Sequence, residues 1–282
     1  GYAVPFLLDP TVINTAVDNG SVANMRRLAR VETGVSDKWN GVSSDGVTAT
    51  YAAEFDEVTE STPTLDQPSI TAKKAHALIK HSVEIAGDWA GAGSTFRNML
   101  DRAKANLEEE KFTTGSGTGN EPKGLITALA GSASETATAT NDVFAIADVY
   151  SLYDALADRF QDRATWMANG SIYSLVRQFD TAGGAGLWER IGGGLPSTLI
   201  DQPVAKNPFM AGAVADAADI MVFGEFAEGF LIYDRVGMNV ELIPLMMGAT
   251  NNLPDGTRGL YAWWRNGSDV VNLTALHLLT VA

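Results

Sequence analysis

The sequence predicts an α+β fold, in which helices and strands are mixed without a regular βαβ repeat. One amphipathic helix is predicted over residues 94–112, and a second begins near residues 147–148. Short β-favouring runs dominate from residue 219 onward. A doubly wound sheet would require strands and helices to alternate regularly. The irregular order therefore favours α+β.

The chain has 282 residues, which is enough for one large core or for two modest domains. The hydrophobic content of 45% and the mean hydropathy of −0.01 are ordinary for a folded protein. No apolar run reaches the roughly 18 residues that a membrane helix needs, so no membrane partner is expected. The absence of cysteine excludes disulfides, zinc–thiolate sites and thiol catalysis.

The formal net charge is −14. A protein that grips nucleic acid by its phosphates needs a basic face. The largest clusters of basic residues here are two pairs, Arg26–Arg27 and Lys73–Lys74. Tight or sequence-specific binding of DNA or RNA is therefore not expected.

Residues 1–40 are predicted to form an extended arm, and residues 41–85 a long β-hairpin. The outgoing strand is predicted over residues 47–55 and the return strand over residues 70–85, with an acidic tip over residues 56–68. A hairpin with one thin apolar face is not stable alone in water, so it needs a partner surface. Phe55, Glu57 and Pro63 in this excursion are candidate assembly residues.

The helix over residues 94–112 has Phe96, Leu100 and Leu107 on one face, and it ends in a glycine run. Gly115, Gly117, Gly119 and Pro122 are candidate structural residues, because glycine permits positive φ and proline fixes a turn. A nucleotide-binding loop is disfavoured. The run fails G-x-G-x-x-G at its last position, and it follows a helix where that motif follows a strand. The acidic run at residues 108–110 is expected to be a solvated face.

Residues 128–142 are small and polar, and they mark the predicted domain boundary. The helix that follows carries Val149, Leu152 and Phe160 on one face. A buried strand is then predicted over residues 164–170, around Trp166, and a third helix over residues 171–179. Trp188 lies in a glycine-rich loop and is a candidate interface anchor. The predicted late strands cover residues 220–224, 230–234, 238–243, 259–265 and 270–281.

No catalytic, cofactor-binding or metal-ligating residue is predicted. His76 and His81 are five positions apart on a predicted strand, so they point to opposite faces, which is poor metal geometry. No G-x-S-x-G nucleophile elbow occurs. A glycosidase-type pair of carboxylates stays open at this stage, because only a distance in space identifies one.

Five motifs follow the predicted proline-bearing arm, long hairpin and long helix. They are Gly-Ser-Gly-Thr-Gly-Asn-Glu-Pro-Lys-Gly-Leu at 115–125, Ala-Thr-Trp-Met-Ala-Asn at 164–169, Leu-Ile-Asp-Gln-Pro-Val at 199–204, Met-Val-Phe-Gly-Glu-Phe at 221–226 and Ile-Tyr-Asp-Arg-Val-Gly-Met at 232–238. Pro203 belongs to the third motif, and Asp234 and Arg235 belong to the last. The order of these motifs resembles that of the tailed-phage major capsid proteins with the Hong Kong 97 fold.

This resemblance implies an N-terminal arm over 1–40 and an extended loop over 41–85. It implies a peripheral domain over 86–128 and 236–282, which contains a spine helix. The resemblance leaves open whether the last strand belongs to this domain or to the axial domain. An axial domain follows over 129–235. The resemblance also implies a structural protein without enzymatic activity. Copies would form the pentamers and hexamers of an icosahedral shell, assembled in the host cytoplasm as part of a virion.

The shell would enclose double-stranded DNA without reading its sequence, and an acidic inner wall would leave the DNA free to move. Further partners implied are a scaffold, a maturation protease, a portal and cement proteins. Many family members lose an N-terminal region by proteolysis. The start at Gly1 is compatible with that and equally with a trimmed chain.

The founding member of the family cross-links a loop lysine to an asparagine of a neighbour. Residues 41–72 here contain no lysine, so we do not expect that bond. Two alternatives stay open. An encapsulin-type nanocompartment would share the fold, and an enzyme would show a carboxylate pair in a deep cleft.

Overall fold

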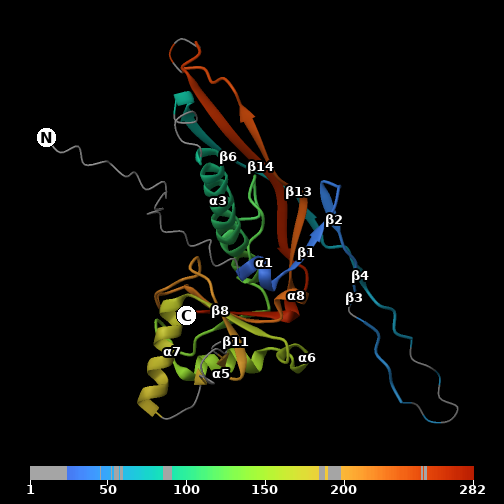
Figure 1. The fold of residues 1–282 in the computed structure, drawn as a ribbon. Helices are drawn as coiled ribbons and strands as arrows, with labels where there is room; N and C mark the ends of the chain where they lie inside the picture. Colours follow the sequence, from blue (N-terminus) through green and yellow to red (C-terminus); the bar gives the residue numbers. More distant parts are fainter. Residues whose placement is uncertain are drawn as a thin grey trace.

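The structure is a computed structural model. It describes residues 24–282 except 45, 52, 54–56, 58–59, 85–90, 184–187, 190–197, 249 and 251–252. Most of the predicted arm and Phe55 therefore lie outside the described residues. Helices and strands are mixed, and most of the described strands form a four-stranded upper sheet and a seven-stranded lower sheet (Figure 1). This arrangement confirms the predicted α+β class.

The upper sheet has the strand order β1-β13-β14-β6. Its strands are β1 (Arg30–Thr33), β13 (Phe230–Ile243), β14 (Thr257–Val270) and β6 (Lys73–Ser82). The helix α3 (Ala92–Thr114) lies along one face of this sheet (Figure 1), where Leu100 packs with Ala262 and Trp264. The predicted helix over 94–112 is confirmed, and it is two residues longer at each end.

The two predicted late strands over 230–234 and 238–243 are one continuous strand in the structure. Irregularities in the pairing of β13 with β14, between Asp234 and Val236 and between Val236 and Asn239, occur where the sequence suggested a break. A bulge absorbs such a break without ending the strand. The predicted strand over 259–265 likewise extends to fill β14.

The run over residues 70–85 does not return along the hairpin as predicted. Only β5 (Ser69–Thr71) pairs with β2 (Lys38–Asn40), and β4 (Leu65–Asp66) pairs with β3 (Ser43–Ser44). Residues 73–82 form β6, which pairs with β14 over its full length. The predicted pairing of residues 70–85 with the outgoing strand of the hairpin is therefore wrong. The apolar face of β6, with Ala75, Ala77 and Ile79, packs instead against the cluster that contains Leu100 of α3.

The lower sheet has the strand order β7-β15-β12-β8-β11-β10-β9. The central strand β8 (Thr165–Ala168) is buried at every position, as predicted. The other strands are β7 (Glu135–Ala137), β15 (Leu276–Thr280), β12 (Asp219–Gly224), β11 (Gln202–Lys206), β10 (Thr198–Leu199) and β9 (Trp188–Glu189). The last strand, β15, thus pairs with residues of the central segment and not with β13 or β14.

The core of the lower region contains α5 (Ile146–Ala155), α6 (Asp158–Gln161) and α7 (Gly170–Gly183) together with the lower sheet. The predicted second helix breaks near Leu156, which leaves the helical conformation, so Phe160 belongs to α6. The third helix is confirmed over residues 171–179.

A second apolar cluster joins the two sheets. It contains Met25 of α1 (Asn24–Leu28), Phe112 of α3, Met167 of β8 and Phe230 of β13. The short helices α4 (Leu125–Leu129) and α8 (Phe226–Gly229) and the 3-10 turn η2 (Leu273–Ala275) surround it. This shared core ties the upper and lower sheets into one body. Within the described part of the chain, none of the helices has the length and apolar character that crossing a bilayer requires.

Candidate assembly surfaces

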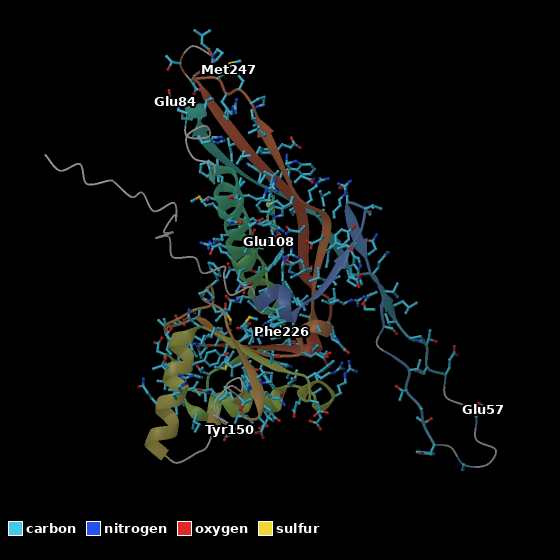
Figure 2. All side chains as sticks on the ribbon, viewed as in Figure 1. Glu57, Glu84, Glu108, Tyr150, Phe226 and Met247 are labelled. Atoms are coloured by element: carbon cyan, nitrogen blue, oxygen red, sulfur yellow. The ribbon has the colours of Figure 1, made fainter. Side chains whose placement is uncertain are left out.

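One segment leaves the body of the subunit. Residues 41–68, here called the projecting loop, run out from the short pairings of β2 with β5 and of β3 with β4 (Figure 1). Figure 2 shows Glu57 at its far end, away from both sheets. Side chains at Val42, Val47 and Leu65 are 77%, 67% and 66% exposed. These apolar side chains are therefore left open to solvent in the single subunit.

Two of the predicted loop candidates, Glu57 and Pro63, are exposed. The single subunit thus gives neither of them a packing role. Their assignment to assembly stays a prediction.

The base of the projecting loop is fastened by polar contacts. Asp37 forms ion pairs with Arg235 and with Arg265, the latter at 3.1 Å between Oδ1 and Nη1. Arg235 Nε also donates to the carbonyl of Val35 at 3.1 Å. The Tyr233 hydroxyl donates to the carbonyl of Ser36 at 2.8 Å. Arg235, predicted from its motif, therefore positions the segment from which the loop departs.

Asp234, the residue before Arg235, takes part in a cluster of charged side chains from three elements. Arg26 of α1 donates through Nη1 and Nη2 to the two Asp234 oxygens, at 2.7 and 2.9 Å, and through Nε to Glu108 at 2.7 Å. Asn266 of β14 donates to the other Glu108 oxygen at 2.7 Å. Burial opposes the charge of Arg26, but the hydrogen bonds that Arg26 donates to Asp234 and Glu108 outweigh this effect and raise the Arg26 pKa above its ordinary value.

The expectation that residues 108–110 form a solvated face is wrong for two of the three. The Glu108 and Glu109 residues are 6% and 2% exposed. Glu109 accepts from the backbone N–H of Met25 at 3.2 Å, so it holds the start of α1. A buried carboxylate is stable only where such partners surround it. The sequence signal for this burial was the Arg26–Arg27 pair. Arg26 lies 82 positions before Glu108, so the sequence alone did not indicate that the two side chains meet.

The end of α3 and the glycine run form a tight turn. Gly117 and Gly119 have positive φ angles of 71° and 60°. Gly115 has ordinary φ, but a Cβ there would lie 2.3 Å from the carbonyl oxygen of Pro122. Gly117 N–H donates to that same oxygen at 3.1 Å. The run is therefore a turn that brings the chain back beside α3.

Lys111 of α3 pairs with Glu121 of the turn at 2.9 Å. This hydrogen bond, with others from the backbone N–H and hydroxyl of Ser116, lowers the Glu121 pKa to about 2. The pair thus links the helix to the turn at neutral pH.

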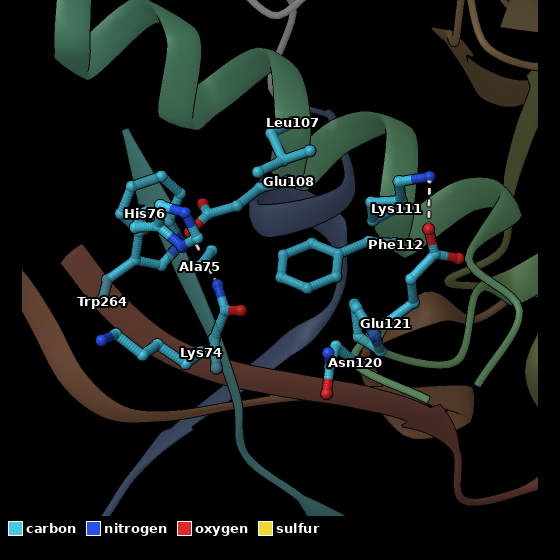
Figure 3. Close-up of a pocket in the computed structure, with 12 residues that line it drawn as sticks. Lys74, Ala75, His76, Leu107, Glu108, Lys111, Phe112, Asn120, Glu121 and Trp264 are labelled. Carbon is cyan, nitrogen blue, oxygen red and sulfur yellow. Dashed lines mark hydrogen bonds and ion pairs between the residues drawn. The ribbon is translucent and has the colours of Figure 1, made fainter. Parts of the chain in front are cut away.

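A cavity of about 240 Å³ lies between α3, β6 and β14 (Figure 3). Leu107, Glu108, Lys111 and Trp264 are among its lining residues. Of its charged groups, Glu108 pairs with Arg26 and Lys111 pairs with Glu121, whereas Lys74 Nζ lies over the rings of Tyr261 and Trp263. In the described residues, no group of three or more His, Asp or Glu side chains is placed to hold a metal ion.

The remaining predicted residues lie in the lower region. Trp166 is fully buried, stacks on Phe223 with 4.0 Å between ring centroids, and donates from Nε1 to the carbonyl of Leu199 at 2.8 Å. Pro203 is an exposed residue of β11. Trp188 lies on the edge strand β9, and its side chain is outside the described residues. Trp166 thus serves the core of the subunit itself.

Comparison with known proteins was made on sequence and on structure. The phage capsid family model matches residues 1–281. The capsid of a native GTA particle is 24% identical, with a TM-score of 0.84, and the match covers 100% of this chain and 96% of the other. A structure of Mycobacterium phage Ogopogo is 15% identical, with a TM-score of 0.67 and coverages of 99% and 97%.

The holo-SrpI encapsulin complex of Synechococcus elongatus PCC 7942 is 11% identical. Its TM-score is 0.69, and the match covers 97% of this chain and 92% of the other. A search of curated protein sequences found no significant match. These structural likenesses show that the chain has the Hong Kong 97 type of fold.

The family match spans nearly the whole chain, and the fold agrees with it. The chain therefore belongs to the phage capsid family, in which it is a major capsid protein and a component of the virion.

Proposed function

We propose that copies of this chain assemble, as pentamers and hexamers, into an icosahedral shell that encloses the double-stranded DNA of a tailed phage. The observation that carries the proposal is the projecting loop, whose exposed Val42, Val47 and Leu65 are left without a partner in one subunit. Closed assemblies bury such surfaces by repeating one contact many times. The role is structural, and we propose no catalytic activity.

Within the shell, we propose the division into arm (1–40), extended loop (41–85), peripheral domain (86–128 and 236–282) and axial domain (129–235). Two strand pairings bear on this proposal: β6 pairs with β14, and β15 pairs with β12. They support a loop that ends near residue 72, before β6, and a last strand that belongs to the axial domain. Assembly in the host cytoplasm, with a scaffold, a maturation protease, a portal and cement proteins, belongs to the same proposal.

Enclosed DNA would meet a protein of net charge −14. Electrostatic repulsion then keeps the DNA from sticking to the wall, so the shell contains it without reading its sequence.

The direct test is electron microscopy of the purified protein across protein concentration, salt and pH. We expect closed shells of uniform size with five-fold vertices. A protein that stays monomeric under every assembly condition, with its projecting loop folded compactly on its own body, would contradict the proposal.

A second candidate is an encapsulin-type compartment, which the structural likeness to the encapsulin favours as a fold. The two differ in their contents. Portal and terminase genes beside this gene, and DNA inside particles from the native source, would indicate a phage capsid. An enzyme packed in the particles, without DNA, would indicate a compartment.

A further inference from the structure

Two basic side chains lie next to each other near the far end of the upper sheet, where β6 stops (Figure 1). The register of β6 with β14 pairs His81 with Arg258. They continue the row of Ile79 and Leu260, which packs toward α3, because alternate residues of a strand share a face. The His81 ring lies 5.2 Å from the ring of Phe96 of α3, measured between centroids, which agrees with this placement. We call His81 and Arg258 the basic pair.

Each member of the basic pair contains a nitrogen that lacks a hydrogen-bond partner. Nε of Arg258 and Nδ1 of His81 are shielded from solvent, and no group in the described residues forms a hydrogen bond with either. Asp255, three positions before Arg258, pairs with Lys80 instead. Glu84, three positions after His81, is exposed, and in the described part of the chain no carboxylate pairs with Arg258. Because buried polar groups in native proteins are almost always satisfied, two such nitrogens side by side indicate a missing partner.

The missing partner of the basic pair is an anion that can enter from solvent. Arg258 and His81 are each only partly buried, so a small ion can reach them. Arg26 shows what satisfies a guanidinium elsewhere in this subunit, where the carboxylates of Asp234 and Glu108 accept its hydrogen bonds. The basic pair has the same donor chemistry without the carboxylates.

We infer that the basic pair binds a doubly charged tetrahedral oxyanion, such as phosphate or sulfate. The planar guanidinium of Arg258 donates two parallel hydrogen bonds, a geometry that fits two oxygens of one such ion. The His81 ring donates a third through Nδ1 when that nitrogen carries a proton. One dianion balances the guanidinium and a protonated imidazole together, which a single carboxylate does not. The inference concerns one subunit and does not depend on shell formation.

Histidine NMR of the unassembled subunit tests the site, because the chain contains three histidines in all. Protein labelled at its histidine rings is titrated with sulfate against chloride, at constant pH and constant ionic strength, so that screening does not change. We expect a saturable shift of the His81 signals. His76 on the opposite face of β6 and His277 of β15 should show no saturable shift.

Variants of Arg258 separate a built site from general attraction. Arg258→Gln should weaken sulfate binding at His81 at least about tenfold, as expected for the loss of two charge-assisted hydrogen bonds. Arg258→Lys keeps the charge without the fork and should weaken binding less. Arg30→Gln removes one positive charge from an exposed site on the opposite edge of the sheet, and it should leave the dissociation constant unchanged. Spectra recorded without sulfate show that each variant is folded.

Further ions identify the ligand. Phosphate should act like sulfate. Stronger binding of O-phosphoserine than of phosphate would support a phosphorylated side chain as the source, and weaker binding would support the free ion.

Three results would overturn the inference: an acetate response equal to that of sulfate, no saturable shift at His81, or an unchanged dissociation constant in Arg258→Gln. None of them bears on the proposed function, which electron microscopy of the particles tests separately.

Discussion

Glu108 of α3 accepts a hydrogen bond from Arg26 of α1 at 2.7 Å, although the two residues are 82 positions apart in the chain. The same carboxylate accepts from Asn266 of β14. One side chain thereby holds together the start of the described chain, the long helix and the upper sheet.

We predict that Glu108→Gln lowers the free energy of unfolding by about 2 kcal/mol. A broken buried ion pair costs about 3–5 kcal/mol, and the partial exposure of Arg26 reduces that figure. Urea unfolding of the unassembled subunit measures it. Glu110→Gln, with a side chain that is 40% exposed, is the matched control and should change stability by less than about 0.5 kcal/mol. Equal effects of the two variants would refute a special role for the cluster.

We predict unequal effects of alanine within the glycine turn. At Gly115 the new Cβ would meet the carbonyl oxygens of Pro122 and Lys111 at 2.3 and 2.4 Å, so the turn cannot close without moving backbone. At Gly119 no atom lies within 4 Å, and only the positive φ of 60° is unfavourable, by about 1–2 kcal/mol.

Thermal unfolding should therefore show a much larger drop in melting temperature for Gly115→Ala than for Gly119→Ala. Gly119→Asn, which tolerates positive φ, should be milder still. A larger drop for Gly119→Ala than for Gly115→Ala would mean that the positive φ angle, and not steric clash, limits substitution in this turn.

We predict a graded response at Trp166. Truncation by Trp166→Ala should destabilise the subunit by about 3–5 kcal/mol, because it opens a cavity in the lower core. Trp166→Phe keeps most of the packing against Phe223 but leaves the carbonyl of Leu199 without its donor, at a cost of about 1–3 kcal/mol. Denaturant unfolding of both variants gives the two values. A phenylalanine variant as unstable as the alanine variant would assign the stability to the hydrogen bond.

We predict that His277 makes the subunit acid-sensitive. Burial lowers the His277 pKa below its ordinary value of 6.5, so below pH 6.5 the unfolded state binds more protons than the folded state. Stability is therefore complete above pH 6.5 and falls as the pH drops from there.

Melting temperatures of the unassembled subunit between pH 7.5 and 5.5 provide the measurement. His277→Gln should flatten their decline, and His76→Gln, at an exposed position, should not. If the melting temperatures of both histidine variants fall with pH as steeply as those of the wild type, another group causes the acid sensitivity.

The elements with strong local signals were predictable from the sequence. The long helix, the buried strand around Trp166 and most of the late strands follow from apolar periodicity and β-branched runs, which depend only on neighbouring residues. The predicted strand over 270–281 is wrong in its first part, because a 3-10 turn at Leu273–Ala275 precedes β15. The ordered motifs also led to the capsid family and its fold. The periodicity of β6 was correctly interpreted as a strand, but its partner was misassigned, because alternation defines a face and not the neighbour that pairs with it.

The sequence by itself determined which segments are helical or extended, which carry charge, and that all the charged residues between positions 41 and 72 are acidic. Only the tertiary structure decided that Glu108 and Glu109 are buried, that β6 joins β14, and that the aromatic and basic residues of two distant strands share one face. The physical reason is that local conformation depends on adjacent residues. Burial, ion pairing and strand order depend instead on groups that folding brings together from far along the chain.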